Sequence, residues 1–208
     1  MNLGQIKVDY VIFFSDAVFA FSITFMALSI QLPNFPSNIL ESELTRRLGQ
    51  LIIPNIIHYV ISFLVVAMYW ISYHRIFEQI KRTNIILIWF NMLFLLFISL
   101  VAYFTGLLAT YDTHRIVVIA FASVLASTGF ILCAIWLYAA HNRKLVDEDL
   151  HPQVVKYFLI RSLVSPFTFI ISVGISFIDV QAAQYFWIVI LPAYVIVNKI
   201  HLQGLSKL

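Results

Sequence analysis

The residues best suited to chemistry are polar side chains placed inside long apolar runs. Ser15 and Asp16 lie in the first run, Trp70 and His74 lie four residues apart in the second, and Asn91 lies in the third. An ionised carboxylate near the middle of a membrane helix costs about 2.5–3.5 kcal/mol on insertion scales, so such a group normally faces protein or water. These five side chains therefore need partners, and they are the first candidates for a site.

Two interpretations of this polar set remain open. Alternating helices that cross a membrane bring the five side chains to a similar depth, where a hydrogen-bonded network satisfies all of them and fixes the first helix. Alternatively, Asp16 and His74 carry protons or bind an ion, since intramembrane carboxylates and histidines are the usual carriers of such roles. The second interpretation predicts a proton-coupled secondary transporter.

The first apolar run also holds a helical stripe that contains a single hydroxyl group. Residues at steps of three and four place Phe14, Ala17, Phe21, Thr24 and Leu28 on one face. A competing stripe consists of Ile23, Ala27 and Ile30. Such a stripe is typical of helix interfaces and also of pores. In a symmetric oligomer, a ring of threonines would contact a partly dehydrated cation, and apolar rings beside it would gate by dewetting.

The composition identifies the elements that must position these residues. The chain of 208 residues is 62% hydrophobic and 11% charged, with a mean hydropathy of +0.93, whereas soluble domains are about 25% charged. We expect one all-α membrane domain over residues 1–208. The predicted spans cover about 10–32, 51–77, 85–108, 115–140, 154–178 and 185–200. Asn38 and Glu41 suggest a capping pair for a separate short amphipathic helix before the second span.

The basic residues predict the orientation of the chain in the membrane. With six spans, ten of the thirteen Lys and Arg residues lie on the side of the N-terminus. The other three are Arg46, Arg47 and Arg115. By the positive-inside rule, both termini are expected in the cytoplasm of a multi-pass protein of the cell (inner or plasma) membrane. The first run is too long for a signal peptide and is expected to be retained.

Several function classes lack support in the sequence. HExxH, GxSxG and glycine-rich phosphate loops are absent, so an enzyme is not expected. The net charge is only +3, and the basic residues form no patch with interleaved aromatic residues, which argues against binding of nucleic acid. Cys133 is the only cysteine, and the histidines are scattered. We therefore expect no permanent metal site and no cofactor.

Two longer stretches resemble a known family. FSDAVFAFSIT, residues 14–24, is similar to the first-helix signature of the transmembrane protein 175 family, the lysosomal potassium channel and its bacterial relatives. Residues 63–100 resemble the second and third helices of that family, with the tryptophan and histidine at Trp70 and His74 and the asparagine at Asn91. The resemblance covers residues 10 to about 108 with specific motifs.

The resemblance implies a bacterial single-repeat channel. Six transmembrane helices per subunit would assemble as a homotetramer in the lipid bilayer, with the four first helices lining a central pore that passes potassium and other monovalent cations. By position, the constriction of the family falls on Phe21 and Leu28, and its hydroxyl layer falls on Thr24, where potassium would bind transiently. Two departures stand out: Tyr10 replaces the arginine of the family, and Phe21 replaces an aliphatic residue.

Overall fold

The fold is a bundle of long helices, seen in a computed structural model that describes residues 6–28, 36 and 38–205. In chain order the elements are α1 (Val8–Leu28), α2 (Glu41–Gln79), α3 (Ile85–Tyr111), α4 (Arg115–Ala140), η2 (His141–Arg143), α5 (Pro152–Ser176), α6 (Val180–Phe186), η3 (Trp187–Val189) and α7 (Ile190–Leu205). Within the described residues, six helical stretches are long and apolar enough to cross a membrane, the sixth running from Val180 to Lys199 through α6, η3 and most of α7. The all-α fold with six candidate spans, expected from the sequence, is confirmed.

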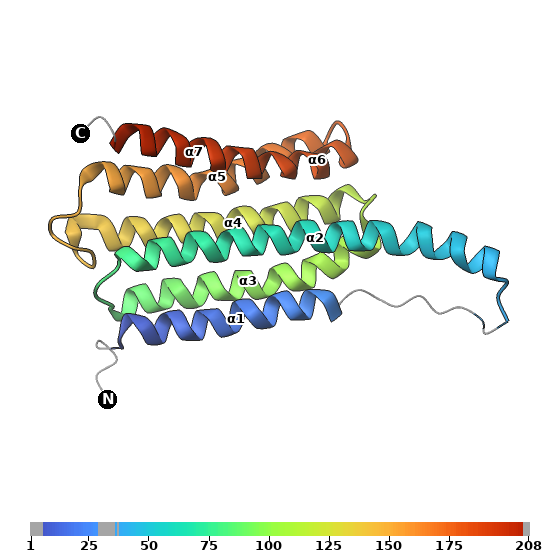
Figure 1. Cartoon of the computed structure of the whole chain (residues 1–208), viewed down its shortest axis with the longest axis horizontal. Helices are drawn as coiled ribbons and strands as arrows, with labels where there is room; N and C mark the ends of the chain where they lie inside the picture. The colour runs from blue at the N-terminus through green and yellow to red at the C-terminus, as the bar shows by residue number, and fades with distance from the viewer. Residues whose placement is uncertain (1–5, 29–35, 37, 206–208) are drawn as a thin grey trace.

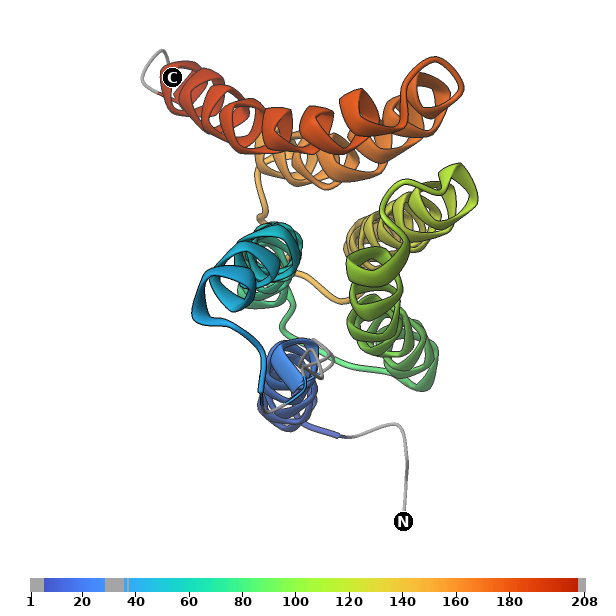
Figure 2. The ribbon, with the colours of Figure 1, turned by 90° about the vertical axis from the view of Figure 1, so that its right-hand side faces the viewer.

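The helices are arranged so that α1 lies at one edge of the bundle. Viewed along the helices, α5 and α7 lie at the opposite edge, and α2, α3 and α4 lie between (Figure 2). Helix α1 packs against α2 and α3, α4 packs against α3 and α5, and α7 packs against α5. The central position of α4 explains why it is the most enclosed of the six candidate spans. Helix α1, by contrast, is left with one face uncovered.

The end of the bundle where α1 begins also holds the end of α7 and the connections from α2 to α3 and from α4 to α5 (Figure 1). The α4–α5 connection carries both signs of charge, yet part of it is buried. Leu145 and Val146 are buried, and the carbonyl oxygen of Leu145 accepts a hydrogen bond from the backbone N–H of Lys81 at 2.8 Å. The apolar pair anchors the loop to the turn after α2, because its burial removes apolar surface from water.

Helix α2 is longer than a membrane requires. Its 39 residues span about 58 Å at 1.5 Å per residue, against a hydrocarbon core of about 30 Å. Its first turns extend beyond the ends of the neighbouring helices (Figure 1). The separate helix expected before the second span is thus continuous with it. The predicted cap is also wrong, because Leu40 occupies the N-cap position and makes no side-chain cap hydrogen bond.

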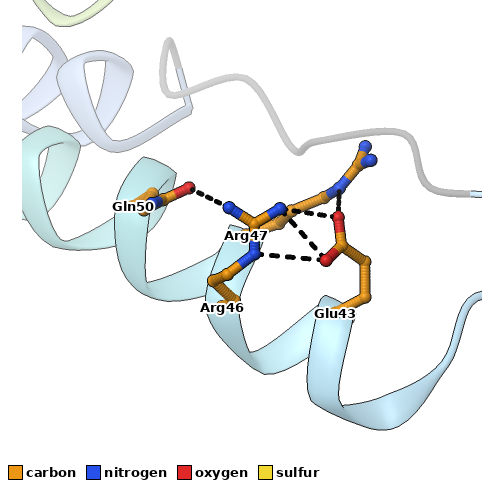
Figure 3. Close-up of polar contacts among 4 residues, drawn as sticks. All are labelled: Glu43, Arg46, Arg47 and Gln50. Carbon is orange, nitrogen blue, oxygen red and sulfur yellow. Dashed lines mark hydrogen bonds and ion pairs between the residues drawn. The ribbon is translucent and has the colours of Figure 1, made fainter.

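The projecting part of α2 carries a compact charged cluster (Figure 3). Glu43 accepts hydrogen bonds from Arg46 Nη2 at 2.8 Å and from Arg47 Nε at 2.6 Å. These hydrogen bonds, that of Arg46 first, lower the pKa of Glu43 to about 2. All three side chains are at least one-third exposed, and exposed ion pairs contribute little to stability. The cluster therefore satisfies charges along one helix and does not attach α2 to another element.

Candidate functional site: helix α1 and its polar anchor

The site begins with the two faces of α1. The buried face repeats at steps of three and four residues through Val11, Ser15, Phe19, Ser22 and Met26. Every member of the stripe of Phe14, Ala17, Phe21, Thr24 and Leu28 is exposed. Phe21 and Leu28 are 70% and 75% exposed. In the competing stripe, Ile23 is half-buried and Ala27 exposed, while Ile30 lies outside the described residues.

Asp16 is held by α2 through one carboxylate oxygen. Its Oδ1 accepts a hydrogen bond from Trp70 Nε1 at 2.8 Å and lies 2.7 Å from His74 Nε2. Because an ionised carboxylate only accepts, His74 Nε2 carries the proton in this arrangement. Trp70 and His74 lie four residues apart on one helix face, and their rings meet edge-on with centroids 4.5 Å apart. Two donors on one rigid face thus fix the position of the Asp16 carboxylate.

Ser15, the neighbour of Asp16, makes a second set of contacts that is fully buried. Its Oγ lies 2.7 Å from the Val11 carbonyl oxygen, 2.7 Å from the Tyr73 hydroxyl and 3.1 Å from the amide nitrogen of Asn91. The three contacts are compatible if Ser15 donates to the Val11 carbonyl oxygen while Tyr73 and Asn91 each donate one proton to Ser15 Oγ. This serine therefore joins α1 to α2 and α3 at one point.

The structure brings together the five polar residues expected to meet, in two adjacent groups. Asp16 pairs with Trp70 and His74, whereas Ser15 pairs with Asn91 and with Tyr73, which the sequence analysis missed. Tyr73 gives no polar signal of its own because tyrosine is common in apolar packing, and its ring stacks on Phe77 at 4.2 Å. A usable signal was that Ser15 and Asp16 are adjacent, as are Tyr73 and His74. Adjacent residues on a helix point about 100° apart, so two polar neighbours on α1 can each meet one of two polar neighbours on α2.

Thr24 lies on the exposed face, eight residues and about 12 Å beyond Asp16 along the helix. Its hydroxyl donates to the Ala20 carbonyl oxygen at 2.9 Å, which leaves the lone pairs of the oxygen directed away from the helix and able to contact a cation. Phe21 precedes it by three residues and stacks on Phe25 with ring centroids 5.9 Å apart. The exposed face thus presents one oxygen between large apolar side chains.

The other histidines were the remaining candidates for a metal centre. In the part of the chain that the structure describes, no group of three or more His, Cys, Asp or Glu side chains could hold a metal ion. His58, on α2, is buried. Its Nε2 lies 3.0 Å from Gln184 Oε1, and the amide nitrogen of Gln184 donates to the Asp112 carbonyl oxygen at 2.7 Å. This contact joins α2 to α6 at the end opposite the Asp16 network.

Comparison with known proteins gives a consistent result. The family described as "Endosomal/lysosomal potassium channel TMEM175" matches residues 10–101. A protein of Streptomyces collinus named a potassium channel is 26% identical over 80% of this chain and 81% of its own length. A second protein so named, from Chamaesiphon minutus, is 26% identical over 80% of this chain and 83% of its own. The crystal structure of a lysosomal potassium-selective channel TMEM175 homologue from Chamaesiphon minutus has a TM-score of 0.78 at 25% identity, covering 91% of this chain and 96% of that one. In sequence and in fold, the chain is similar to proteins of the TMEM175 family.

This similarity to the TMEM175 family gives the geometry its context. The matched segment from residue 10 to residue 101 includes the whole exposed stripe of α1 and both groups of the polar network. The structural likeness extends over nearly the full chain, so α4 to α7 belong to the same TMEM175 fold. The two bacterial relatives are named potassium channels, and the six long apolar helices of this chain make it a multi-pass membrane protein.

Proposed function

We propose that this chain forms a potassium-conducting, weakly selective monovalent cation channel, in which four copies of α1 surround one central pore. The observation that carries the proposal is the uncovered stripe of α1, which has one hydroxyl between apolar side chains while the opposite face of the same helix is fixed by buried polar contacts. The names of the bacterial relatives support potassium as the permeant ion.

Several copies are needed because the stripe lies on the outside of a single bundle. Helix α1 is at the edge of the subunit (Figure 2), and no described helix covers Phe21 or Leu28. A symmetric ring of subunits would turn these side chains inward and enclose a path along the bundle axis. The tetramer is the arrangement that the family resemblance implies.

In this pore, the Thr24 hydroxyls form the polar layer, and Phe21 and Leu28 form the apolar constrictions on either side. At 1.5 Å per residue, the constrictions lie about 4.5 Å and 6 Å from the threonine layer along the helix. An ion that has shed part of its hydration shell in an apolar ring would find oxygen ligands within one turn. The phenyl side chain at position 21, stacked on Phe25, makes that constriction bulkier than an aliphatic residue would.

The polar network has a supporting role in this proposal. Asp16, with Ser15, fixes the rotation of α1 about its axis, so that the stripe faces the pore. The excess of basic residues at the end where α1 begins supports cytoplasmic termini, and we place the channel in the cell membrane. The alternative, a transporter that moves protons through Asp16 and His74, is not favoured, because both groups are engaged with each other at 2.7 Å and the relatives are named channels.

The decisive experiment measures cation flux through the purified protein in liposomes under potassium and sodium gradients. Thr24→Ala is expected to lower selectivity for potassium over sodium while flux persists. The matched control is Thr110→Ala on α3, because the Thr110 hydroxyl is also exposed and donates to the carbonyl oxygen four residues before it, at 3.0 Å. Equal selectivity in the wild type, Thr24→Ala and Thr110→Ala would remove Thr24 from the filter, and saturable uptake that requires a pH gradient would favour the transporter.

A further inference from the structure

A buried guanidinium lies far from α1, between α5 and α7. Arg161 is only 6% exposed and lies nine residues after Pro152, about 14 Å along α5. Helices α5 and α7 form the edge of the bundle opposite α1 (Figure 2). A buried charge is costly unless it is paired with an opposite charge and hydrogen-bonded. The partners of Arg161 therefore decide whether this cost is met within the chain.

Among the described residues, hydrogen-bond partners are found for only one nitrogen of this guanidinium. Nη1 donates to Asn198 Oδ1 and, at 3.5 Å, to the Tyr157 hydroxyl oxygen, and the group lies over the Tyr194 ring, 4.8 Å from its centroid. Nε is buried and has no hydrogen-bond partner among the described residues. Neither α5 nor α7 contains an acidic residue, so the charge has no counter-ion on either of the helices that enclose it.

The unused edge of the guanidinium is the one that recognises oxyanions. Nε and Nη2 point the same way and can donate two parallel hydrogen bonds to a carboxylate or phosphate. The protein engages Nη1, which lies outside this edge, so the edge makes no hydrogen bond with a described residue, and its Nε atom is enclosed. The Tyr157 and Asn198 side chains that border the group are only half-buried, so an anion can approach along this rim.

Two further cations stand beside this rim. Lys156 precedes Tyr157, Lys199 follows Asn198, and both lysines are exposed. Side chains on a helix lean towards its N-terminus, so Arg161 leans towards the end of the bundle where α1 begins, which is also where α7 ends (Figure 1). The guanidinium of Arg161 thus lies between two helices that contain no acidic residue, and the two exposed lysines are the sequence neighbours of the residues that border it.

We propose that Arg161, Lys156 and Lys199 bind the phosphate group of an anionic phospholipid in the leaflet at this end of the bundle. Basic pockets between membrane helices on this side are typical binding sites for anionic headgroups. A lipid supplies the phosphate at the depth of Arg161, where a soluble ion would have to leave water. The bound lipid would supply the missing counter-ion and join α7 to α5. The proposal depends on the membrane-spanning fold and not on ion conduction.

The test uses the purified full chain in detergent, titrated separately with phosphatidylglycerol, phosphatidylcholine and inorganic phosphate. Native mass spectrometry counts the bound lipid and gives an apparent affinity. Phosphatidylglycerol is expected to bind and to raise Tm, whereas phosphatidylcholine and inorganic phosphate do neither. Arg161→Gln is expected to weaken phosphatidylglycerol binding about 10- to 100-fold, because it removes charged hydrogen bonds.

A second pair of variants keeps the test independent of folding at Arg161. The double variant Lys156→Gln with Lys199→Gln changes only exposed side chains and is expected to weaken binding about 25-fold. The control, Lys81→Gln with Arg82→Gln, removes two exposed charges from the turn between α2 and α3 and should leave the affinity unchanged. An equal loss in both double variants would mean general attraction to the basic surface and would overturn the proposal. Binding of inorganic phosphate as tight as that of phosphatidylglycerol would overturn the assignment to a lipid.

Discussion

Replacing Asp16 by asparagine distinguishes two roles of this residue: a structural anchor of α1 and a proton carrier. The amide oxygen of asparagine can still accept from Trp70 and His74, which lie 2.8 Å and 2.7 Å from Asp16 Oδ1, but neither bond is then assisted by charge. A hydrogen bond to a charged group contributes about 1.5–3 kcal/mol and a neutral one about 0.5–1.5 kcal/mol. Two such bonds would together lose about 2 kcal/mol, and the 37% exposure of the Asp16 side chain reduces the expected loss to about 1–2 kcal/mol.

The assay follows thermal unfolding of the purified protein together with passive potassium flux in liposomes. At roughly 2–4 °C per kcal/mol for a chain of this size, Asp16→Asn should lower Tm by about 2–8 °C. Potassium flux through the folded variant should persist. Glu148→Gln serves as the control, because the Glu148 side chain is 83% exposed, and its stability should change by less than about 0.5 kcal/mol.

A double-mutant cycle isolates the contact that the prediction depends on. Trp70→Phe removes the indole donor, so the combined variant with Asp16→Asn should lose less stability than the sum of the two single variants, by at least about 0.5 kcal/mol. The anchoring role is refuted if Asp16→Asn unfolds at the wild-type temperature and yet abolishes transport. That outcome would return Asp16 to the role of a proton carrier.

Two further predictions compare matched pairs of substitutions, both measured by thermal unfolding. Ser15→Ala should destabilise the protein by about 1–3 kcal/mol, because it strands the buried Tyr73 hydroxyl and an Asn91 N–H; Ser22→Ala, on the same face, should be neutral or stabilising, since the Ser22 hydroxyl is buried with no hydrogen-bond partner among the described residues. A larger loss for Ser22→Ala than for Ser15→Ala would contradict the assignment of the contacts. Gly129→Ala should cost about 1–3 kcal/mol by overpacking, because the added Cβ would lie 2.6 Å from Pro166 Cδ. Gly174→Ala, whose Cβ would meet no atom within 4 Å, should stabilise α5 by up to about 1 kcal/mol; similar losses at both glycines would show that the close contact with Pro166 is not the cause.

Part of the site was predictable because polar groups inside apolar helices have few acceptable environments. Asp16 could be expected to meet Trp70 and His74, since each is costly to leave without a partner in a membrane. That the polar residues form two groups, one around Asp16 and one around Ser15, could not be predicted, because this depends on how α1 is rotated against α2 and α3. The same limitation hid Tyr73, whose hydroxyl is engaged only because Ser15 lies opposite it.

The burial of Arg161 is a second feature that the sequence could not predict. The sequence places an arginine near the start of an apolar run, where a flexible side chain often reaches water. The structure instead encloses it between α5 and α7 with Asn198 as its partner, a contact across 37 residues that no local pattern encodes. His58 is similar, since its burial follows from the position of Gln184 on α6.

The sequence by itself determined the membrane class and the approximate positions of six spans, because hydrophobic length is a local property of the chain, but it left two stripes of the first helix open. Tertiary structure decided which polar groups are hydrogen-bonded to one another, and that the guanidinium of Arg161 is enclosed by helices without acidic residues. It also decided that α2 continues as one helix past the ends of its neighbours. These features depend on the rotation and depth of each helix relative to the others. That rotation is set by packing over the whole bundle, and it leaves the stripe of Phe21, Thr24 and Leu28 uncovered on the outside of the subunit.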